Sequence, residues 1–110
     1  HYGGAFPLWL APEQVRILPI TDNQIDYAKK IGSILKANDF RVKVDMSSSK
    51  IGAKIREAQL EKIPYMLVIG NKEVENSTVA VRSRTAGDLG PKKLEDFISQ
   101  LKDEARIPSR

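Results

Sequence analysis

The sequence contains no cysteine and a single histidine, His1. Without thiols the chain can form no disulfide, no thiolate metal site and no cysteine nucleophile, which fits a reducing compartment. One histidine cannot supply a Ser/His/Asp triad or a metal site built from several imidazoles. We therefore expect no catalytic residue and no metal ligand in this chain.

Long apolar runs and phosphate-binding loops are missing as well. No stretch approaches the roughly 20 apolar residues that a membrane span needs, and no signal peptide is visible, so we expect no membrane partner. Neither G-x-x-x-x-G-K-[ST] nor G-x-G-x-x-G occurs, which removes the two common nucleotide-binding loops. A dyad between Lys50 and one of the serines 47–49 is the remaining nucleophile candidate, but serines before a helix are usually caps.

Aromatic residues are scarce, with three Phe, three Tyr and one Trp among 110 residues. Extended stacking of a nucleic-acid single strand is therefore not predicted. Basic residues, in contrast, are in excess, and the net charge is +4. Residues 50–84 hold seven basic and four acidic side chains and thus most of that excess. This local charge favours encounter with a polyanion, although extra lysines also keep small domains soluble.

The pattern of apolar residues predicts a single α/β domain. Strands are expected at residues 15–20, 40–44, 65–69 and 78–84. Helices are expected after residues 21–24, 47–49 and 90–91. Strands that alternate with helices favour a three-layer sandwich whose sheet is parallel at first and mixed after a final hairpin. The wholly apolar strand 65–69 is expected at the sheet centre, and strand 40–44, with one polar face, near an edge.

Local signals predict where the helices begin and end. Thr21 and Gln24 form a capping box for the first helix, and Asn38 is expected to end it in the left-handed conformation. Serines 47–49 are N-cap candidates for the second helix. Residues 75–77 are expected to turn the chain before the last strand, and Pro91 to occupy the first turn of the final helix.

Basic residues gather on the segment from the second helix to the last strand. Alternation on strand 78–84 places Arg82 and Arg84 on one face, roughly 7 Å apart, where they can address phosphates or base edges. An exposed strand face with solvated arginines is the alternative. The start of the second helix, residues 48–50, is a candidate phosphate contact. Lys54 on the same helix is expected to be exposed and to neutralise phosphate.

Three segments carry a resemblance to a known family. YGGAFPLWLAPEQV at the start, KIGAKIREAQLEKIPYMLVIG in the middle, and NKEVENSTVAVRSR followed by DLG resemble the C-terminal anticodon-binding domain of bacterial threonyl-tRNA synthetases. The likeness covers nearly the whole chain. Prolyl, histidyl and glycyl enzymes carry the same type of domain, and the combination of FPLWLAP, KIREAQ and VAVRSR points to the threonyl member.

The resemblance implies a five-stranded mixed sheet with three helices that binds the anticodon loop of threonine tRNA and reads its second and third bases, G and U. By position, Arg82 resembles the guanidinium that addresses those bases, Glu73 the acid that contacts the uracil edge, and Lys62 a supporting basic contact. Ser48 stands where the bacterial pattern has asparagine, and a hydroxyl replaces that amide only in part. The expected RNA-binding residues are Ser48, Lys50, Lys54, Lys62, Glu73, Arg82 and Arg84.

The resemblance also implies domain boundaries and partners. Residues 1–12 are expected to be the linker from a catalytic domain absent from this sequence, with residues 2–6 at its exit, and residues 13–110 the anticodon-binding domain. The start at His1 rather than methionine suggests a fragment of a longer chain. ATP, zinc and threonine sites are expected in the missing catalytic domain, so the fragment needs no cofactor and is not an enzyme. The parent is expected to be a cytoplasmic, homodimeric, ATP-dependent threonine–tRNA ligase.

Three other interpretations remain. The domain could belong to a prolyl, histidyl or glycyl enzyme instead. A pure interaction module, docking on another domain through Trp9 and the linker, would bind no RNA. A small α/β enzyme or nucleotide binder would need a general base or a phosphate loop, and the sequence offers neither motif.

Overall fold

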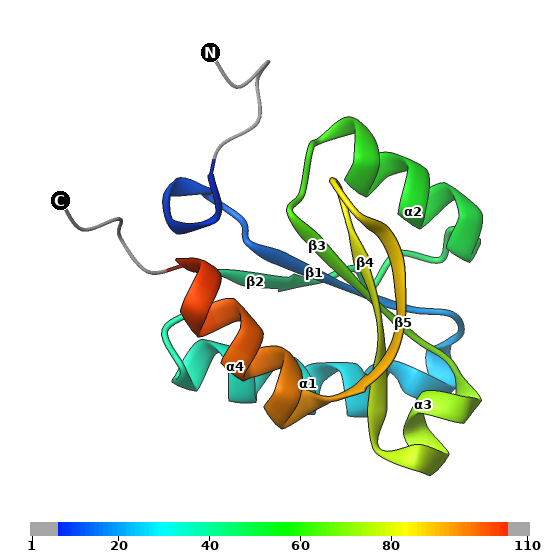
Figure 1. The fold of residues 1–110 in the computed structure, drawn as a ribbon. Coiled ribbons are helices and arrows are strands. Elements are labelled where there is room, and N and C mark those ends of the chain that lie inside the picture. The colour runs from blue at the N-terminus through cyan, green and yellow to red at the C-terminus, as the bar shows by residue number, and fades with distance from the viewer. Residues whose placement is uncertain (1–6, 106–110) are drawn as a thin grey trace, which may run out of the picture.

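The computed structural model describes residues 7–105, which form a five-stranded sheet with helices on both faces (Figure 1). In chain order the elements are η1 (Leu8–Leu10), β1 (Val15–Pro19), η2 (Asp22–Gln24), α1 (Ile25–Ala37), β2 (Val42–Val44), α2 (Ile51–Leu60), β3 (Tyr65–Ile69), α3 (Asn71–Asn76), β4 (Thr78–Ser83), β5 (Gly87–Lys93) and α4 (Leu94–Ala105). Both η elements are short 3₁₀ turns. The expected alternation of strands and helices is present, with α3 and β5 as additional elements.

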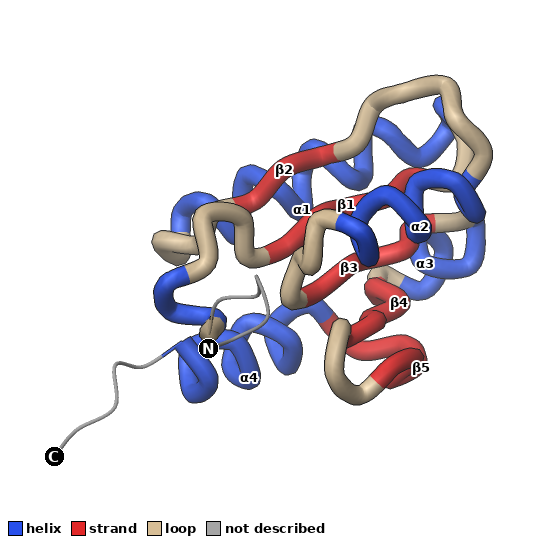
Figure 2. The backbone as a smooth tube through the Cα atoms, turned by 90° about the horizontal axis from the view of Figure 1, so that it is seen from above, coloured by secondary structure: helices blue, strands red, loops and turns tan. Residues whose placement is uncertain are grey.

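The sheet has the strand order β2-β1-β3-β4-β5, which Figure 2 shows from above. β1 pairs in parallel with both β2 and β3, whereas β4 is antiparallel to β3 and β5 is antiparallel to β4. The apolar β3 is thus the central strand and β2 an edge strand, which confirms both predictions. The carboxyl ends of the three parallel strands meet at one end of the sheet, where ligands of open α/β sheets usually bind.

Two apolar layers hold the helices on the sheet. On one face α1 and α4 pack over side chains such as Ile17 and Leu67, and Phe97 of α4 is completely buried there. On the other face Ala58 of α2 packs against Leu18 and Met66. Figure 1 shows α1 and α4 below the sheet and α2 above it. The predicted three-layer α/β sandwich with a five-stranded mixed sheet is confirmed.

The predicted capping box before α1 is present, but the end of this helix differs from expectation. The Thr21 backbone N and Oγ1 donate to Oε1 of Gln24 at 2.7 and 2.9 Å. At the other end, the left-handed residue is Asp39, with φ of 69°, and not Asn38, with φ of −96°. The side-chain amide of Asn38 donates to the Ile34 carbonyl at 2.9 Å, and the Asn38 backbone N donates to the same carbonyl at 3.2 Å, so both groups cap the last turn of the helix.

The expectation that serines 47–49 cap α2 is wrong. The N-cap residue of α2 is Lys50, which makes no side-chain cap bond. Ser47 N donates instead to Asp45 Oδ1 at 2.9 Å, so an aspartate shapes the loop that leads into the helix. Ile51 and Ile55 pack with Ala58 in the core under α2, as their spacing predicts.

The expectation that Pro91 starts the last helix is also wrong, because residues 87–93 form β5 and α4 starts at Leu94. Gly90 has φ of 79°, which is incompatible with a helix. The β4–β5 register shifts between Val81 and Arg82, as at a β-bulge. Pro91 lies on an edge strand, the position in a sheet that tolerates a missing N–H.

The turn expected at residues 75–77 is a short helix with a left-handed end. Helix α3 runs over Asn71–Asn76, and Ser77 closes it with φ of 56°. The chain then enters β4, so β3 and β4 are antiparallel neighbours joined by a helix rather than by a tight hairpin turn. The short helix projects Glu73 from the end of the sheet.

The segment just before β1 packs on the domain. Leu8 and Ala11 are buried, and Gln14 Nε2 donates to the Leu8 carbonyl at 2.9 Å. Arg41 adds two bonds from its guanidinium, to the carbonyls of Ala11 at 2.7 Å and Trp9 at 3.1 Å. The boundary between linker and domain at residues 12 and 13 stays a prediction, and the expected exit from a catalytic domain at residues 2–6 lies outside the described residues.

Candidate functional site

Arg82 lies on the face of β4 that looks toward α2. Val79 and Val81 are fully buried in the core shared with α1 and α4, so Ala80 and Arg82 point to the opposite face. This alternation confirms the prediction for β4. In the ladder Arg82 pairs with Met66, which packs against α2, and Arg82 itself is half-buried. Arg82 therefore lies on the same face of the sheet as α2, toward the end of β4 that leads to Arg84.

A polar hollow of about 290 Å³ lies at the start of α2 and the carboxyl end of β1. Its polar lining includes Thr21, Asp22, Ser47, Ser48, Ser49 and Lys50. We call it the serine hollow. It brings together three of the predicted RNA-binding residues: Ser48 and Lys50, both exposed, and Lys54. Hydroxyl groups that donate and accept, together with one acid and two lysines, suit hydrogen bonding to the mixed donor and acceptor edge of a nucleobase.

Lys54 also borders the serine hollow, but it is not the exposed lysine that the sequence suggested. Its side chain is only 4% exposed, and Nζ donates to the carbonyls of Pro19 at 2.9 Å and Asp45 at 3.4 Å. Residues 51, 54 and 58 fall on one face of α2, so position 54 looks inward. The ammonium ties the end of β1 to the loop after β2. A direct RNA contact of Lys54 stays a prediction, and its bonds inside the fold do not support it.

Asp45 anchors the loop that carries the serines. Burial raises the pKa of its carboxyl, but the hydrogen bonds from Ser47 and the charges of Lys54 and Arg16 outweigh burial and hold the pKa below its ordinary value. The carboxylate therefore stays ionised at neutral pH and keeps the loop in place.

Glu73 lies in the first turn of α3, just beyond the carboxyl end of β3. Its Oε1 accepts a hydrogen bond from Gly70 N at 2.7 Å, which satisfies a backbone donor at the helix start. A Cβ at Gly70 would lie 2.8 Å from Cδ1 of Ile20, so a larger residue here would have to displace the end of that side chain. Burial, with a contribution from the charge of Glu73, raises the pKa of Tyr27. The uracil contact of Glu73 stays a prediction, and Oε1 already accepts the bond from Gly70.

A second hollow, of about 300 Å³, lies at the opposite end of α2 and is lined by Gln59, Lys62, Arg84 and Thr85. We call it the arginine hollow. Arg84 Nη1 donates to the Lys62 carbonyl at 3.0 Å, and Arg84 N donates to the Pro64 carbonyl at 3.0 Å. Lys62 has φ of 57°, a left-handed conformation that turns the chain out of α2. These bonds hold the two basic residues side by side.

The structure thus separates the predicted RNA-binding residues into two groups. Ser48, Lys50 and Lys54 line the serine hollow, whereas Lys62 and Arg84 line the arginine hollow. Arg82 lies on β4, two residues before Arg84. The sequence predicted all of these residues on one supersecondary unit but could not predict that they occupy both ends of α2.

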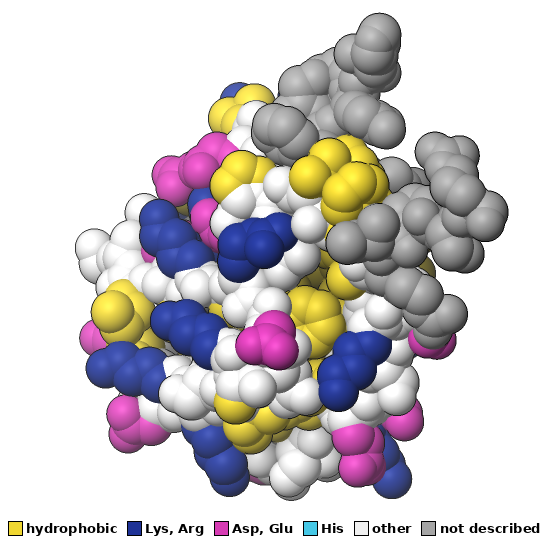
Figure 3. All heavy atoms as spheres, turned by 90° about the vertical axis from the view of Figure 1, so that its left-hand side faces the viewer, with side chains coloured by type: hydrophobic (Ala, Val, Ile, Leu, Met, Phe, Trp, Pro, Cys, Tyr) yellow, Lys and Arg dark blue, Asp and Glu magenta, His cyan; other side chains and the backbone are white. Residues whose placement is uncertain are grey.

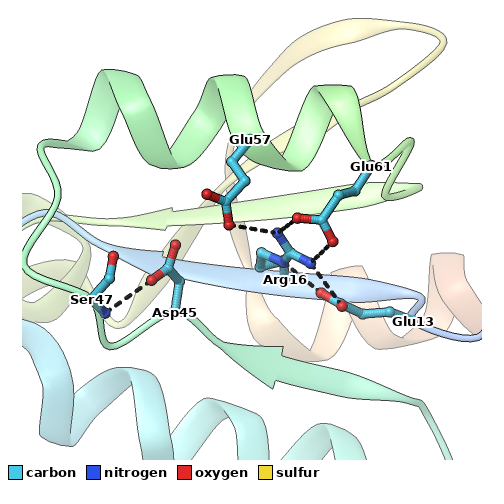
Figure 4. A network of polar contacts seen from close by, with 6 residues as sticks. All are labelled: Glu13, Arg16, Asp45, Ser47, Glu57 and Glu61. Carbon is cyan, nitrogen blue, oxygen red and sulfur yellow. Dashed lines mark hydrogen bonds and ion pairs between the residues drawn. The ribbon is translucent and has the colours of Figure 1, made fainter.

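A buried arginine network beneath α2 escaped the sequence analysis. Arg16, on β1, is 1% exposed; its Nε and Nη2 donate to Glu13 at 2.6 and 2.9 Å, and its Nη1 and Nη2 donate to Glu61 at 3.1 and 2.9 Å (Figure 4). Glu57 adds a longer ion pair at 3.9 Å. The hydrogen bonds that Arg16 donates to Glu13, and then those to Glu61, raise the pKa of Arg16 despite its burial. The sequence signal that could have indicated this network is an arginine inside the apolar run VRILP, three residues after a glutamate.

The Arg16–Glu61 pair predicts a loss of stability in acid. The hydrogen bond from Arg16 lowers the pKa of Glu61 below 4.5 in the folded state. The stabilisation of the fold by this ion pair is therefore present above pH 4.5 and is lost as the pH falls through the lowered pKa of Glu61. We expect the difference in melting temperature between wild type and Glu61→Gln to be largest at neutral pH and to shrink below about pH 4.5. Because the Glu61 side chain is 49% exposed, the effect is modest. A difference that stays constant from pH 7 to pH 3 would contradict this assignment.

Other surfaces of the described chain differ from the two hollows. A hollow of about 460 Å³ between α1 and α4 is lined by Ile34, Leu94 and Ile98 among others, on the far face of the sheet from α2, and contains none of the predicted residues. Figure 3 shows that Lys and Arg side chains are interspersed with Asp and Glu at the end of the molecule on the left of Figure 1. Within residues 7–105 no acidic or histidine cluster suits a metal ion, and no helix has the length and apolar character needed to cross a bilayer.

Comparison with known proteins identifies relatives that share this architecture. A family model described as an anticodon binding domain matches residues 14–104. The threonine–tRNA ligase of Acetivibrio thermocellus is 60% identical over 101 residues, which are 92% of this chain and 16% of that protein. The corresponding ligase of Clostridium novyi is 58% identical over 104 residues, 94% of this chain and 16% of that protein.

A solved structure supports the same relationship. The RNA binding domain of threonyl-tRNA synthetase from Cryptosporidium parvum Iowa II superposes with a TM-score of 0.93 at 35% identity, covering 99% of this chain and 28% of that one. The matched region includes α2 and β4 and therefore both hollows. The chain spans only about a sixth of the length of the ligases that it matches.

Proposed function

Since the chain belongs to the anticodon-binding domain family, we propose that it binds the anticodon loop of threonine tRNA and reads the second and third anticodon bases, G and U. The observation that carries this proposal is the 58–60% identity to threonine–tRNA ligases over more than nine-tenths of the chain. Prolyl, histidyl or glycyl specificity is not better supported than threonyl specificity. The two polar hollows that flank α2 supply a surface of the required character.

We propose that the full-length protein is a cytoplasmic, homodimeric threonine–tRNA ligase that uses ATP to attach threonine to its tRNA. In this proposal the catalytic groups, ATP and zinc belong to the part of the protein outside this chain, and residues 1–110 contribute binding without catalysis. The domain then holds one end of the tRNA while the catalytic domain of the same polypeptide acts on the other.

The proposed recognition divides the work between base edges and phosphates. Loop bases are unstacked and present their edges, so no duplex groove is needed. Arg82 donates hydrogen bonds to the acceptors of the G and U edges, and Glu73 accepts from the N–H of uracil through the oxygen that does not cap α3. Ser48 offers a hydroxyl to a base at the serine hollow, and Lys50 attracts the adjacent phosphate.

The test of this proposal is a set of affinities for threonine tRNA and for tRNAs changed at one anticodon base each. We expect Arg82→Ala to cost about 1–3 kcal/mol against threonine tRNA and to flatten the preference for G and U, because a directed contact to base edges is lost. Lys50→Ala should weaken all of these tRNAs alike. Glu73→Gln, which gains a donor at equal size, should relax discrimination against cytosine at the third base.

The control is Lys102→Ala, which removes an equal charge from exposed α4 on the far face of the sheet. It should leave both affinity and preference nearly unchanged. Equal losses for every tRNA with Arg82→Ala would make Arg82 a phosphate contact and end its role in base reading. Equal wild-type affinity for threonine, proline, histidine and glycine tRNAs would refute the proposed specificity.

A further inference from the structure

Two neighbouring parallel strands, β1 and β3, end in the same local motif. Their last residues are paired in register, so both strands stop at the same level of the sheet. After β1, Oε1 of Gln24 accepts from the backbone N of Thr21 at 2.7 Å. After β3, Oε1 of Glu73 accepts from the backbone N of Gly70, also at 2.7 Å. In each motif a side chain reaches back three residues to satisfy a backbone N–H at a helix start.

The side chain of Gln24 carries a hydrogen-bond donor that a capping box does not use. Glutamate and glutamine both serve at this position, because only an acceptor oxygen is needed. A glutamine has an NH₂ group as well, and Nε2 of Gln24 donates to Oδ1 of Asn71 at 2.6 Å. Gln24 is only 2% exposed, and a buried donor of this kind needs a partner. The bond therefore links the loop after β1 to the first residue of α3.

Further contacts hold this loop against the start of α3. The backbone N of Ile20 donates to the Ile69 carbonyl at 2.9 Å. Cδ1 of Ile20 lies close to Gly70, 2.8 Å from the position that a Cβ there would occupy. Ile20 and Thr21 line the serine hollow. The wall of the serine hollow and the turn that carries Glu73 are thus one connected unit at the carboxyl ends of β1 and β3.

The carboxylate of Glu73 depends on this unit for its position. Helix α3 has only six residues, too few to be stable by itself, so its contacts with the rest of the domain set its orientation. Glu73 is half-buried, and its Oε1 is already fixed by Gly70. Hydrogen bonds weaken steeply as their geometry departs from the optimum. A small shift of α3 would therefore weaken the base contact proposed for Glu73.

We propose that Gln24 is a positioning residue that acts through Asn71 to hold Glu73 beside the serine hollow and thereby sets discrimination at the third anticodon base. The inference rests on the proposed function for the identity of that base. It adds Gln24 and Asn71 to the recognition site without requiring either side chain to touch RNA. It also accounts for glutamine rather than glutamate in the first capping box, since an ionised carboxylate has no hydrogen to donate.

The experiment compares Asn71→Ala with Asn71→Asp, which keeps an acceptor oxygen for Gln24. Affinities for threonine tRNA and for tRNAs changed at the second or the third anticodon base are measured below the melting temperature of each variant. We expect Asn71→Ala to reduce the preference for uracil over cytosine at the third base by about three- to tenfold, part of the discrimination that one directed base contact supplies. The preference at the second base should not change, because Glu73 does not read it. Asn71→Asp adds a charge that weakens all tRNAs alike, and should keep both preferences.

A matched control and a double variant separate positioning from general support of the fold. Asn76→Ala, at the exposed far end of the same helix, should change neither preference. Asn71→Ala combined with Glu73→Gln should relax the third-base preference no further than Glu73→Gln alone, because both changes act on one contact. Without RNA, amide hydrogen exchange at Gly70 should be faster in Asn71→Ala than in wild type or Asn71→Asp, because the bond from that N–H to Glu73 is loosened.

The outcomes that would overturn the positioning role can be told apart. A third-base preference that survives Asn71→Ala, or equal losses of preference at both bases, would make the bond a support of the fold alone. A lost preference without faster exchange at Gly70 would make Asn71 a direct RNA contact. If wild type itself does not distinguish uracil from cytosine, the proposed reading by Glu73 fails, and the positioning role fails with it.

Discussion

Arg16→Ala is expected to lower the free energy of unfolding by about 2–5 kcal/mol, the range for truncating a large buried side chain. Arg16 is almost completely buried and bonds two carboxylates with both edges of its guanidinium. Its removal leaves a cavity under α2 and brings Glu13 and Glu61 together without a counter-charge. Urea or thermal unfolding of the purified domain measures the change.

Two further variants separate the charge from the packing. Arg16→Met should cost less than Arg16→Ala because its side chain fills much of the space, whereas the glutamates, 21% and 49% exposed, can turn toward water in both variants. Glu57→Ala removes only the 3.9 Å contact of a side chain that is 66% exposed, and should change stability by less than about 0.5 kcal/mol. A loss with Glu57→Ala as large as with Arg16→Ala would show that the ranking of the network's contacts is wrong.

Lys54→Ala is expected to destabilise the domain by about 2–3 kcal/mol and to reduce tRNA affinity only through partial unfolding. The substitution leaves the carbonyls of Pro19 and Asp45 without the ammonium, and unsatisfied buried acceptors are costly. Arg56→Ala, an exposed basic residue on the same helix, is the matched control and should be nearly neutral for stability. Thermal melts and tRNA affinities below the melting transition measure both effects.

The contradicting outcome for Lys54 is specific. If Lys54→Ala melts like wild type and yet binds all tRNAs more weakly, the ammonium contacts phosphate directly, and the role inferred from the sequence is correct. The Lys54 side chain would then be buried only in the absence of RNA.

The sequence predicted those features that depend on short-range periodicity. The apolar run of β3, the alternation of β4 and the stripe of α2 each indicate one element and its buried side, and all three are confirmed. The sequence also indicated that β3 and β4 are neighbours, because the connection between them is short. These features need no knowledge of distant residues.

The features that the sequence did not predict depend on contacts between distant segments or on competing local signals. Arg16 meets Glu61, 45 residues away, and Lys54 meets Pro19, 35 residues away. A glycine followed by proline starts many helices, so the sequence favoured a helix start at Pro91. The left-handed conformation of Gly90 and the pairing with β4 instead place both residues in β5. Whether each predicted RNA-binding residue contacts RNA remains a prediction, because position alone does not measure binding.

The two edges of the sheet affect how the domain behaves at high concentration. An edge strand with open backbone groups invites a strand from another molecule, and long flat edges lead to aggregation. Here β2 has three residues with Lys43 exposed, and β5 carries Pro91, which offers no N–H, beside a shift in register. Both edges therefore resist intermolecular strand pairing. We expect the domain to remain dispersed at concentrations that would drive a smoother sheet into fibrils.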